Sequence, residues 1–333
     1  MPPLDPSPTN PPPAGSSTVS AAERAIAAAR KGRPRSVAAR TAGESLVKTG
    51  LFACALFSIF ITTAIVVVLV RQTISFFGMP EVSLSDFLFG TTWSPLLGEE
   101  KHFGIWPLIN GTLLVSVIAA AFALPVGLVA AIYLAEYAPP RVRATIKPTL
   151  EVLAGVPTVV FGFFAINFIT PGLQLFSGKF GFYNATGAGL AVGMMILPIV
   201  CSLSEDALRA VPRSLRDGAY ALGSTKFDVS VRVVVPAALS GIIAAFLLAI
   251  TRAIGETMIV ALAAGGLANL TIAPWAETQT MTAYMVQIFL GDAPADGVEY
   301  KSSYAVAFVL FLMTLGLTMA GNAVLRRFRE EYE

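Results

Sequence analysis

The chain has 333 residues, of which 55% are hydrophobic and 13% are charged, and its formal net charge is +2. Soluble domains carry roughly a quarter charged residues, so this composition excludes an ordinary soluble domain and is typical of a protein with several membrane spans. The two cysteines indicate no disulfide framework. The chain has neither a metal-ligand spacing nor the phosphate-binding pattern G-x-x-x-x-G-K-[ST]. We therefore expect no cofactor or metal in this chain, and we expect any ATP hydrolysis to belong to a partner.

The N-terminal part combines a polar tail with a first span. Residues 1–20 are rich in Pro, Ser and Thr, which predicts disorder, and a basic stretch follows, so we assign residues 1–48 to a disordered, basic tail. Residues 51–70 are apolar or weakly polar, which is enough, at about 1.5 Å per residue, to cross a bilayer core of roughly 30 Å. Because no small-residue cleavage site follows, we interpret this span as an uncleaved anchor.

Five further spans are expected after an outer amphipathic segment. Residues 71–104 are rich in turns and aromatic side chains, which favours an interfacial position for Phe76, Phe77, Phe87, Phe89, Trp93 and Trp106. The later spans are expected at about 106–133, 150–169, 188–203, 236–264 and 304–325, with Pro125 and Pro157 inside the second and third and Pro171 closing the third. The predicted fold class is all-α, a polytopic integral membrane protein with six transmembrane helices. Its parts are the tail (1–48), the first helix with its outer segment (49–105), a core of five helices (106–325) and a C-terminal tail (326–333).

The charges predict which loops are cytoplasmic. The long charged segment 205–236, called the docking loop below, carries five basic and four acidic residues, and short loops rich in Lys and Arg stay in the cytoplasm. Seven basic residues lie in the N-terminal tail, three after the second span, five in the docking loop and three at the C-terminus, which makes 18 of 23. We therefore expect both termini to be cytoplasmic and all three tryptophans to lie in an outer aromatic belt.

The docking loop contains a recognisable spacing. An acidic residue and two small residues are followed by a glycine after three positions and by V-x-V-P after nine more; the residues are Asp217, Gly218, Ala219, Gly223, Val233, Val235 and Pro236. This spacing resembles the EAA loop of ABC-transporter permeases, E-A-A-x3-G-x9-I-x-L-P, with conservative changes at four positions. The resemblance implies a short helix, a glycine turn and a second helix that insert into a groove on a separate ATPase. The alternative is an ordinary helical hairpin between two spans.

Four other stretches resemble PstC, the permease subunit family of phosphate-specific ABC transporters. They are FGIWPLINGTLLVS at 103–116, LAGVPTVVFG at 153–162, TRAIGETMIVALAAG at 251–265 and MTAY at 281–284. The resemblance implies import of inorganic phosphate across the bacterial cytoplasmic (inner) membrane, driven by ATP and Mg on the partner ATPase. It also implies a complex with a second, PstA-like permease, two PstB-like ATPase subunits and an extracytoplasmic, PstS-like phosphate-binding protein, in membrane lipid and without nucleic acid. Because RAIGET is shared with the sister family PstA, the choice between a PstC-like and a PstA-like chain stays open.

Arg252 and Glu256 are the main candidates for the substrate pathway. They are four residues apart, which places them on one face of a continuous helix, and charges inside a membrane normally face a bundle interior or an aqueous cavity. The 16 residues from Pro236 to Arg252 make about 24 Å of helix, which puts Arg252 at mid-depth or further outward. In the resembling family these positions are implicated in translocation, and a guanidinium fork suits phosphate oxygens. A structural ion pair is the alternative.

Three small polar residues complete the predicted pathway, namely Thr257, Thr158 and Asn110. Such residues in spans more often form hydrogen bonds across packed helices. Nearer the cytoplasmic helix ends, Glu136 and Glu151 are expected to pair with Arg141, Arg143 or Lys147.

Other functions remain as alternatives to phosphate import. A permease for molybdate or sulfate belongs to the same class. A gradient-driven transporter could use Arg252 and Glu256 as a proton relay, but the EAA spacing and the lack of an intramembrane histidine argue against it. A non-transporting scaffold leaves the intramembrane charges unexplained.

Overall fold

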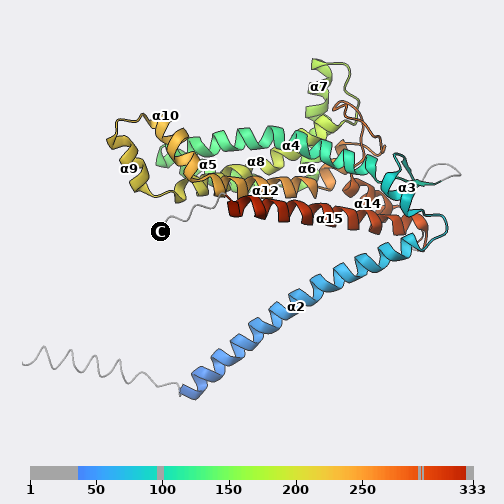
Figure 1. Ribbon diagram of the computed structural model, residues 1–333. Helices are drawn as coiled ribbons and strands as arrows, with labels where there is room; N and C mark the ends of the chain where they lie inside the picture. The colour runs from blue at the N-terminus through green and yellow to red at the C-terminus, as the bar shows by residue number, and fades with distance from the viewer. Residues whose placement is uncertain (1–36, 96–100, 292–293, 295, 328–333) are drawn as a thin grey trace, which may run out of the picture. The chain divides into compact units, whose positions relative to one another are not determined.

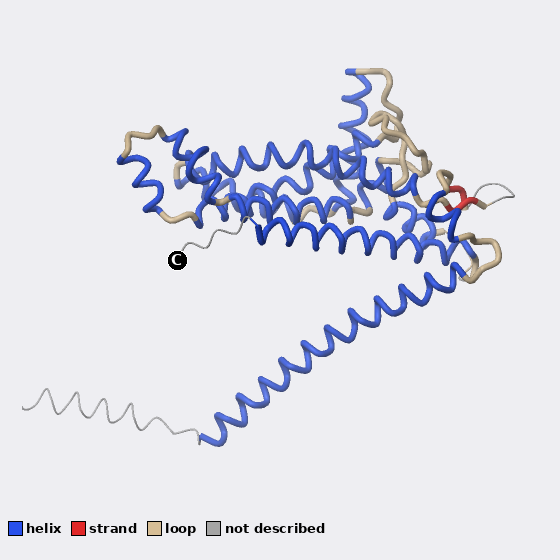
Figure 2. The backbone as a smooth tube through the Cα atoms, viewed as in Figure 1, coloured by secondary structure: helices blue, strands red, loops and turns tan. Residues whose placement is uncertain are grey.

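The computed structural model describes residues 37–95, 101–291, 294 and 296–327. The chain divides into two units, residues 1–66 and 67–333, and each is described by itself. Most of the described residues are helical, and the rest form loops and one pair of two-residue strands (Figure 2). The predicted all-α class is confirmed.

The first span is part of a long helix, α2 (Val37–Phe77). Residues 37–48, which the prediction assigned to the tail, form the first turns of this helix, while residues 1–36 lie outside the described part of the chain. The side chains of residues 44–63 are exposed and mostly apolar. A helix that is apolar on all sides is expected to be surrounded by lipid.

The second unit is a bundle with α8 (Ala185–Ala210) at its centre. In the most apolar stretch of α8, 61% of the residues are buried, whereas the share is at most 28% in the other four long apolar helices. It packs along α4 (Trp106–Ile132) and α12 (Leu239–Ile254), and α15 (Val298–Arg327) packs on α12 (Figure 1). Small residues allow this close packing: a Cβ added at Gly189 would lie 2.7 Å from Cγ2 of Ile118 on α4.

The third span begins later than predicted. The helix α5 (Pro140–Ala154) ends before it, and the span consists of α6 (Thr158–Phe164), the π-helix η2 (Ala165–Ile169) and α7 (Thr170–Phe176). Pro157 precedes α6 instead of lying inside the span, and Pro171 lies in the first turn of α7 instead of closing it. The position of Pro157 suits proline, because the N-terminus of a helix does not need its missing N–H, whereas Pro171 follows the π-helix η2 inside the continuous span. Pro125 lies inside α4, as predicted.

The predicted fifth span is interrupted twice. Pro236 belongs to the short helix α11 (Val235–Ala237), and the stretch 226–237 is bent by 69° from α12. After Ile254 the helix stops, and α13 (Met258–Ala263) follows a three-residue break. In the described chain five helical stretches are long and apolar enough to cross a membrane, or six if the bent pair counts as one span.

The end of the bundle opposite the docking loop is capped by aromatic packing. It holds α3 (Leu84–Phe89), α14 (Met281–Leu290) and the antiparallel strands β1 (Trp93–Ser94) and β2 (His102–Phe103). Of its aromatic residues, Phe76, Phe87 and Trp93 are buried in the protein, whereas Phe89 and Trp106 are strongly exposed. Edge-to-face packing, such as Trp93 on Tyr284 at 4.9 Å between ring centroids, stabilises this core.

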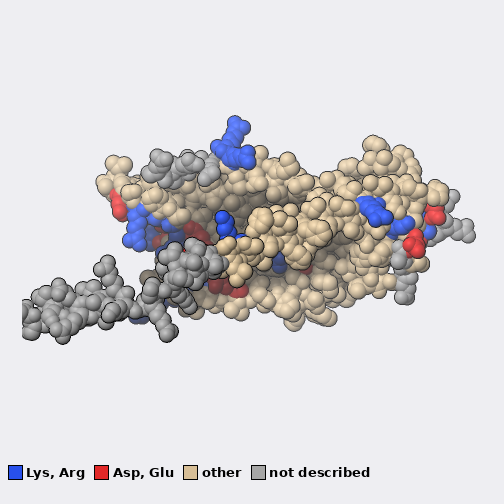
Figure 3. All heavy atoms as spheres, turned by 90° about the horizontal axis from the view of Figure 1, so that it is seen from below, with Lys and Arg blue, Asp and Glu red and all other residues tan. Residues whose placement is uncertain are grey.

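Charged side chains are unevenly distributed over the surface. On the face shown in Figure 3, most Lys, Arg, Asp and Glu side chains lie toward the two ends of the long bundle. Few charged side chains are visible between them, as expected for a membrane-spanning region.

Candidate functional site

The two charged residues predicted to share a helix face lie on either side of a helix end. Arg252 is in the last turn of α12, whereas Glu256 follows the C-cap Gly255 in the break before α13. The prediction that both lie on one helix is therefore wrong. Among the described residues, no ion pair involves either side chain.

Glu256 instead satisfies the backbone of the next helix. Its side chain is buried, and its Oε1 accepts hydrogen bonds from the backbone N–H groups of Met258 (3.2 Å) and Ile259 (3.3 Å). The first N–H groups of a helix have no partner within the helix, and a carboxylate is favoured near them. Glu256 therefore positions the start of α13.

Hydroxyl groups join this break to the neighbouring elements. Thr282 Oγ1 at the start of α14 donates to the carbonyl oxygen of Glu256 (2.6 Å). Thr112 Oγ1 on α4 accepts from the backbone N–H of Met281 (3.0 Å). The break, α14 and α4 are thus connected by hydrogen bonds inside the protein.

The three smaller pathway candidates lie on different elements. Asn110 Nδ2 donates to the carbonyl oxygen of Thr271 (2.7 Å), which holds the segment between α13 and α14 against α4. Thr257 Oγ1 donates to Gly255 O (3.2 Å) within the break, and Thr158 begins α6. Contact of these residues with a substrate stays a prediction.

Arg252 lies on the exposed face of α12. Ala244, Leu248 and Arg252 are exposed and four residues apart, so they form one stripe along the helix, whereas Ala245, Ala249 and Ala253 are buried. Arg252 is the only charged residue of α12. Its guanidinium group therefore points away from the core of this chain. The rest of the stripe around it is apolar.

The docking loop has the geometry that the EAA resemblance implies. A first arm, α9 (Arg213–Ala221), is followed by a turn and by a second arm made of α10 (Lys226–Asp228), η3 (Val229–Val234) and α11. Gly223 in the turn has φ +82°, a left-handed conformation that glycine adopts without penalty.

The acidic and small residues of the motif lie on the first arm. Asp217 and Gly218 are exposed, Ala219 is half-buried, and no atom lies within 4 Å of a Cβ added at Gly218. This arm therefore presents a surface that another protein can approach closely.

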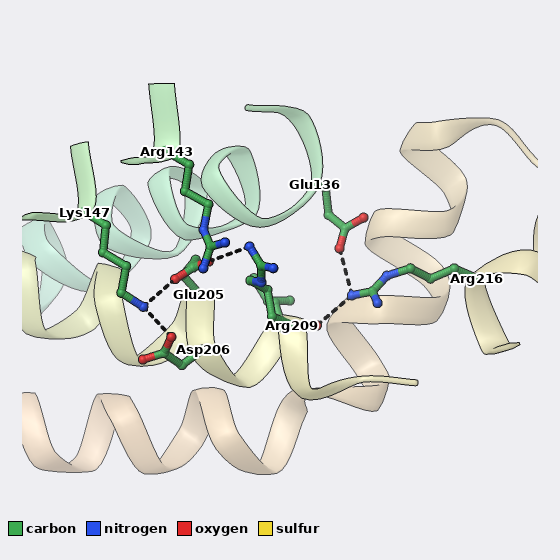
Figure 4. Close-up of polar contacts among 8 residues, drawn as sticks. Glu136, Arg143, Lys147, Glu205, Asp206, Arg209 and Arg216 are labelled. Atoms are coloured by element: carbon green, nitrogen blue, oxygen red, sulfur yellow. Dashed lines mark hydrogen bonds and ion pairs between the residues drawn. The ribbon is translucent and has the colours of Figure 1, made fainter. Parts of the chain in front are cut away.

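A cluster of charges surrounds the buried Glu205 at the end of α8, where the docking loop begins (Figure 4). Glu205 is 1% exposed, and its carboxylate contacts Arg143 Nη2 at 2.7 Å and Lys147 Nζ at 2.9 Å, with Arg209 at 3.8 Å. Burial acts to lower the pKa of Lys147, but its hydrogen bonds to Asp206 and Glu205 outweigh that effect and raise the pKa above its usual value. Since a buried carboxylate needs such partners, α5 is held firmly to α8.

A second buried pair connects the first arm of the loop to the end of α4. Arg216 Nη2 donates to Glu136 Oε1 (3.1 Å) and to Leu208 O (2.8 Å), and its Nη1 donates to Val211 O (2.9 Å). The predicted pairing of Glu136 with Arg141, Arg143 or Lys147 is therefore wrong. Glu151, for which the same partners were predicted, forms no ion pair with any described residue.

Sequence reasoning passed over Glu205 and Arg216. A signal for Glu205 was present, because Cys201, Ser204, Glu205 and Leu208 follow the helical spacing of a buried face and all four are buried. No comparable pattern marks Arg216, whose partners are backbone carbonyls and a residue 80 positions away.

The sequence profile of the family described as "Binding-protein-dependent transport system inner membrane component" matches residues 123–330, which is more than half of the chain. The chain belongs to this family of membrane permease proteins, and the predicted likeness to ABC-transporter permeases is confirmed.

Several curated relatives resemble the chain over most of its length. It is 31% identical to the "Probable ABC transporter permease protein YqgH" of Bacillus subtilis, over 79% of this chain and 84% of that protein. It is 32% identical to the "Phosphate transport system permease protein PstC" of Xylella fastidiosa, over 73% of this chain and 79% of that protein. A "Phosphate transport system permease protein PstA 1" of Mycobacterium tuberculosis is 38% identical, but over only 49% of this chain and 51% of that protein.

Solved structures share the fold at low sequence identity. A bacterial alginate ABC transporter in complex with an alginate pentasaccharide-bound periplasmic protein matches with a TM-score of 0.59 at 13% identity, over 86% of this chain and 96% of that chain. The MetNI methionine ABC transporter, in an inward-facing conformation, matches with a TM-score of 0.51 at 17% identity, over 68% and 95%. These matches establish an ABC permease fold.

Proposed function

We propose that this chain is a permease subunit of an ATP-driven importer of inorganic phosphate. The observation that carries the proposal is the exposed Arg252 on the apolar stripe of α12, in a chain whose relatives over its core include permeases named for phosphate transport.

The position of Arg252 has an energetic consequence. An arginine at the centre of a span costs roughly 2.5 to 3.5 kcal/mol on insertion scales, and Glu256 does not offset this cost, because its carboxylate binds the backbone of α13. The stripe is therefore expected to face water or a partner chain instead of lipid. A guanidinium group with free donors suits a bidentate contact with phosphate oxygens. In this proposal a second, PstA-like permease lies opposite the stripe, and the anion passes between the two chains.

The docking loop defines the expected partners. Its two-arm geometry supports insertion into an ATPase subunit, where ATP and Mg are consumed, and an extracytoplasmic binding protein delivers phosphate at the opposite end. The loop and both termini are then cytoplasmic, and the protein resides in the bacterial cytoplasmic membrane. A reporter fused after Glu333 should act as cytoplasmic and one inserted near Asp296 as external. An external C-terminus would contradict this orientation.

Uptake of labelled anions tests the proposal directly. The chain and its partner subunits are expressed in cells that lack their own phosphate transporter, with and without the ATPase, and labelled phosphate is compared with molybdate and sulfate. We expect phosphate uptake that requires the ATPase. Preferred uptake of molybdate or sulfate would show that one of these anions, and not phosphate, is the substrate. Uptake that persists without the ATPase would favour a gradient-driven transporter.

A further inference from the structure

The π-helix η1 (Tyr133–Tyr137), which continues α4, touches both arms of the docking loop. Glu136 accepts a hydrogen bond from Arg216 of the first arm (3.1 Å), and the Tyr137 ring lies under Lys226 Nζ of the second arm at 4.9 Å from the ring centroid. Along the chain, however, the loop is continuous only with α8 and α12. The contacts of η1 therefore add a connection between the loop and α4 that the backbone does not provide.

The Glu136–Arg216 contact is built differently from a surface ion pair. The side chains are 7% and 16% exposed, and the same guanidinium group also binds two carbonyl oxygens at the end of α8. A planar guanidinium with three fixed acceptors has one preferred orientation, and water screens a buried pair little. By contrast, the Arg232–Asp228 contact within the second arm is 3.5 Å long, and Arg232 is 80% exposed. Arg216 thus holds α9, the end of α8 and the end of α4 together.

α4 extends from this contact to the opposite end of the bundle. It packs against α8 over much of its length, and near its start Thr112 accepts the hydrogen bond from Met281 while Asn110 holds Thr271. A displacement of the docking loop that is passed to η1 therefore reaches the elements around the break between α12 and α13.

We propose that Glu136 and Arg216 are positioning residues that transmit the ATP-driven movement of the docking loop to α4. This inference rests on the proposed function, because it assumes that a partner ATPase moves the loop. Without the contact, the loop still docks and the ATPase still turns over, but α4 does not follow, so that ATP is consumed with little transport.

The test measures anion transported per ATP hydrolysed by the complete complex in proteoliposomes. Glu136→Ala removes the ion pair between the first arm and η1, while Arg216 keeps its two carbonyl partners and Tyr137 keeps its contact with Lys226. We expect normal co-purification of the ATPase, persistent ATP turnover and a fall of the transport ratio of about tenfold, within the usual range of coupling between distant sites. Arg216→Lys should retain only part of the wild-type ratio of anion transported to ATP hydrolysed, since an ammonium group lacks the planar fork.

The control is Arg141→Gln on α5, an exposed cation that forms no ion pair with any described residue; its ratio should equal that of the wild-type chain. An unchanged ratio in Glu136→Ala would overturn the inference. Loss of the folded chain or of ATPase binding in both Glu136→Ala and Arg216→Lys would also overturn it, since the contact would then be merely structural. If the wild-type complex carried molybdate or sulfate, the proposed substrate would be wrong, but the ratio measured with that anion would still decide the coupling role.

Discussion

Thr282 donates a hydrogen bond of 2.6 Å to the carbonyl oxygen of Glu256, and the two residues belong to segments that are separated by 26 positions. Glu256 lies where α12 has ended and α13 has not begun, so its carbonyl oxygen has no helical partner. Thr282 supplies that partner from the first turn of α14. The interruption of the helix is thereby stabilised by a residue from another part of the chain.

Thr282→Val is expected to destabilise the protein by about 1 to 3 kcal/mol, because it leaves a buried carbonyl oxygen without a donor. It also removes the contact between the hydroxyl groups of Thr282 and Thr280 (3.1 Å). The free energy of unfolding in detergent is the measurement. Thr318→Val is the matched control, since Thr318 is exposed and bonds only within its own helix. Equal stability of the two variants would show that the break does not depend on Thr282.

Gly111→Ala should destabilise the contact between α4 and the segment before α14. A Cβ at this position would lie 2.5 Å from Thr278 Oγ1 and would also collide with the carbonyl oxygen of Gln279. Overpacking of this kind costs about 1 to 3 kcal/mol. Gly316→Ala on α15, where no atom lies within 4 Å of the added Cβ, should be neutral or slightly stabilising. Thermal unfolding of both variants in detergent checks this prediction, which a neutral Gly111→Ala would contradict.

Arg252→Gln should reduce phosphate uptake by about 10- to 100-fold, the effect of losing a hydrogen bond to a charged group, while the complex still assembles. Arg252→Lys should restore little, because the ammonium group lacks the planar fork. Since Glu256 binds the backbone of α13 instead of Arg252, the double variant Arg252→Gln, Glu256→Gln should not recover uptake. Recovery in the double variant would mean that the two side chains act as a structural pair after all.

Gly223→Val should abolish co-purification of the ATPase while leaving the chain inserted in the membrane. No atom lies within 4 Å of an added Cβ, so the expected defect comes from the backbone: a left-handed conformation costs L-residues about 1 to 2 kcal/mol, and β-branched residues tolerate it least. Gly223→Asn should therefore keep more of the ATPase, because asparagine visits this region. Normal association and uptake with valine would show that the turn is not needed for docking.

The parts of this protein that were predictable depend on local properties of the sequence. The second span was expected at 106–133, and α4 occupies Trp106–Ile132, because the hydropathy of a lipid-facing helix is local. The turn at Gly223 was implied by the resemblance to the EAA loop, and the structure shows its left-handed backbone. The sixth span was expected at 304–325, whereas α15 begins at Val298. Its first turn is polar, and Glu299 there forms an ion pair with Lys101 (2.7 Å), a contact that hydropathy does not reveal.

The sequence by itself determined the all-α membrane class, the approximate spans and the two-arm docking loop, because apolar length and turn chemistry act between near neighbours. Only the tertiary structure decided the end of α12 at Ile254, the pairing of Glu136 with Arg216 and the burial of Trp93. The spacing of Arg252 and Glu256 fits a continuous helix, and only the bonds from Glu256 to the start of α13 and from Thr282 to Glu256 show what stabilises the interruption. Such contacts join residues that are brought together by packing, and the free energy of a buried charge depends on these distant partners.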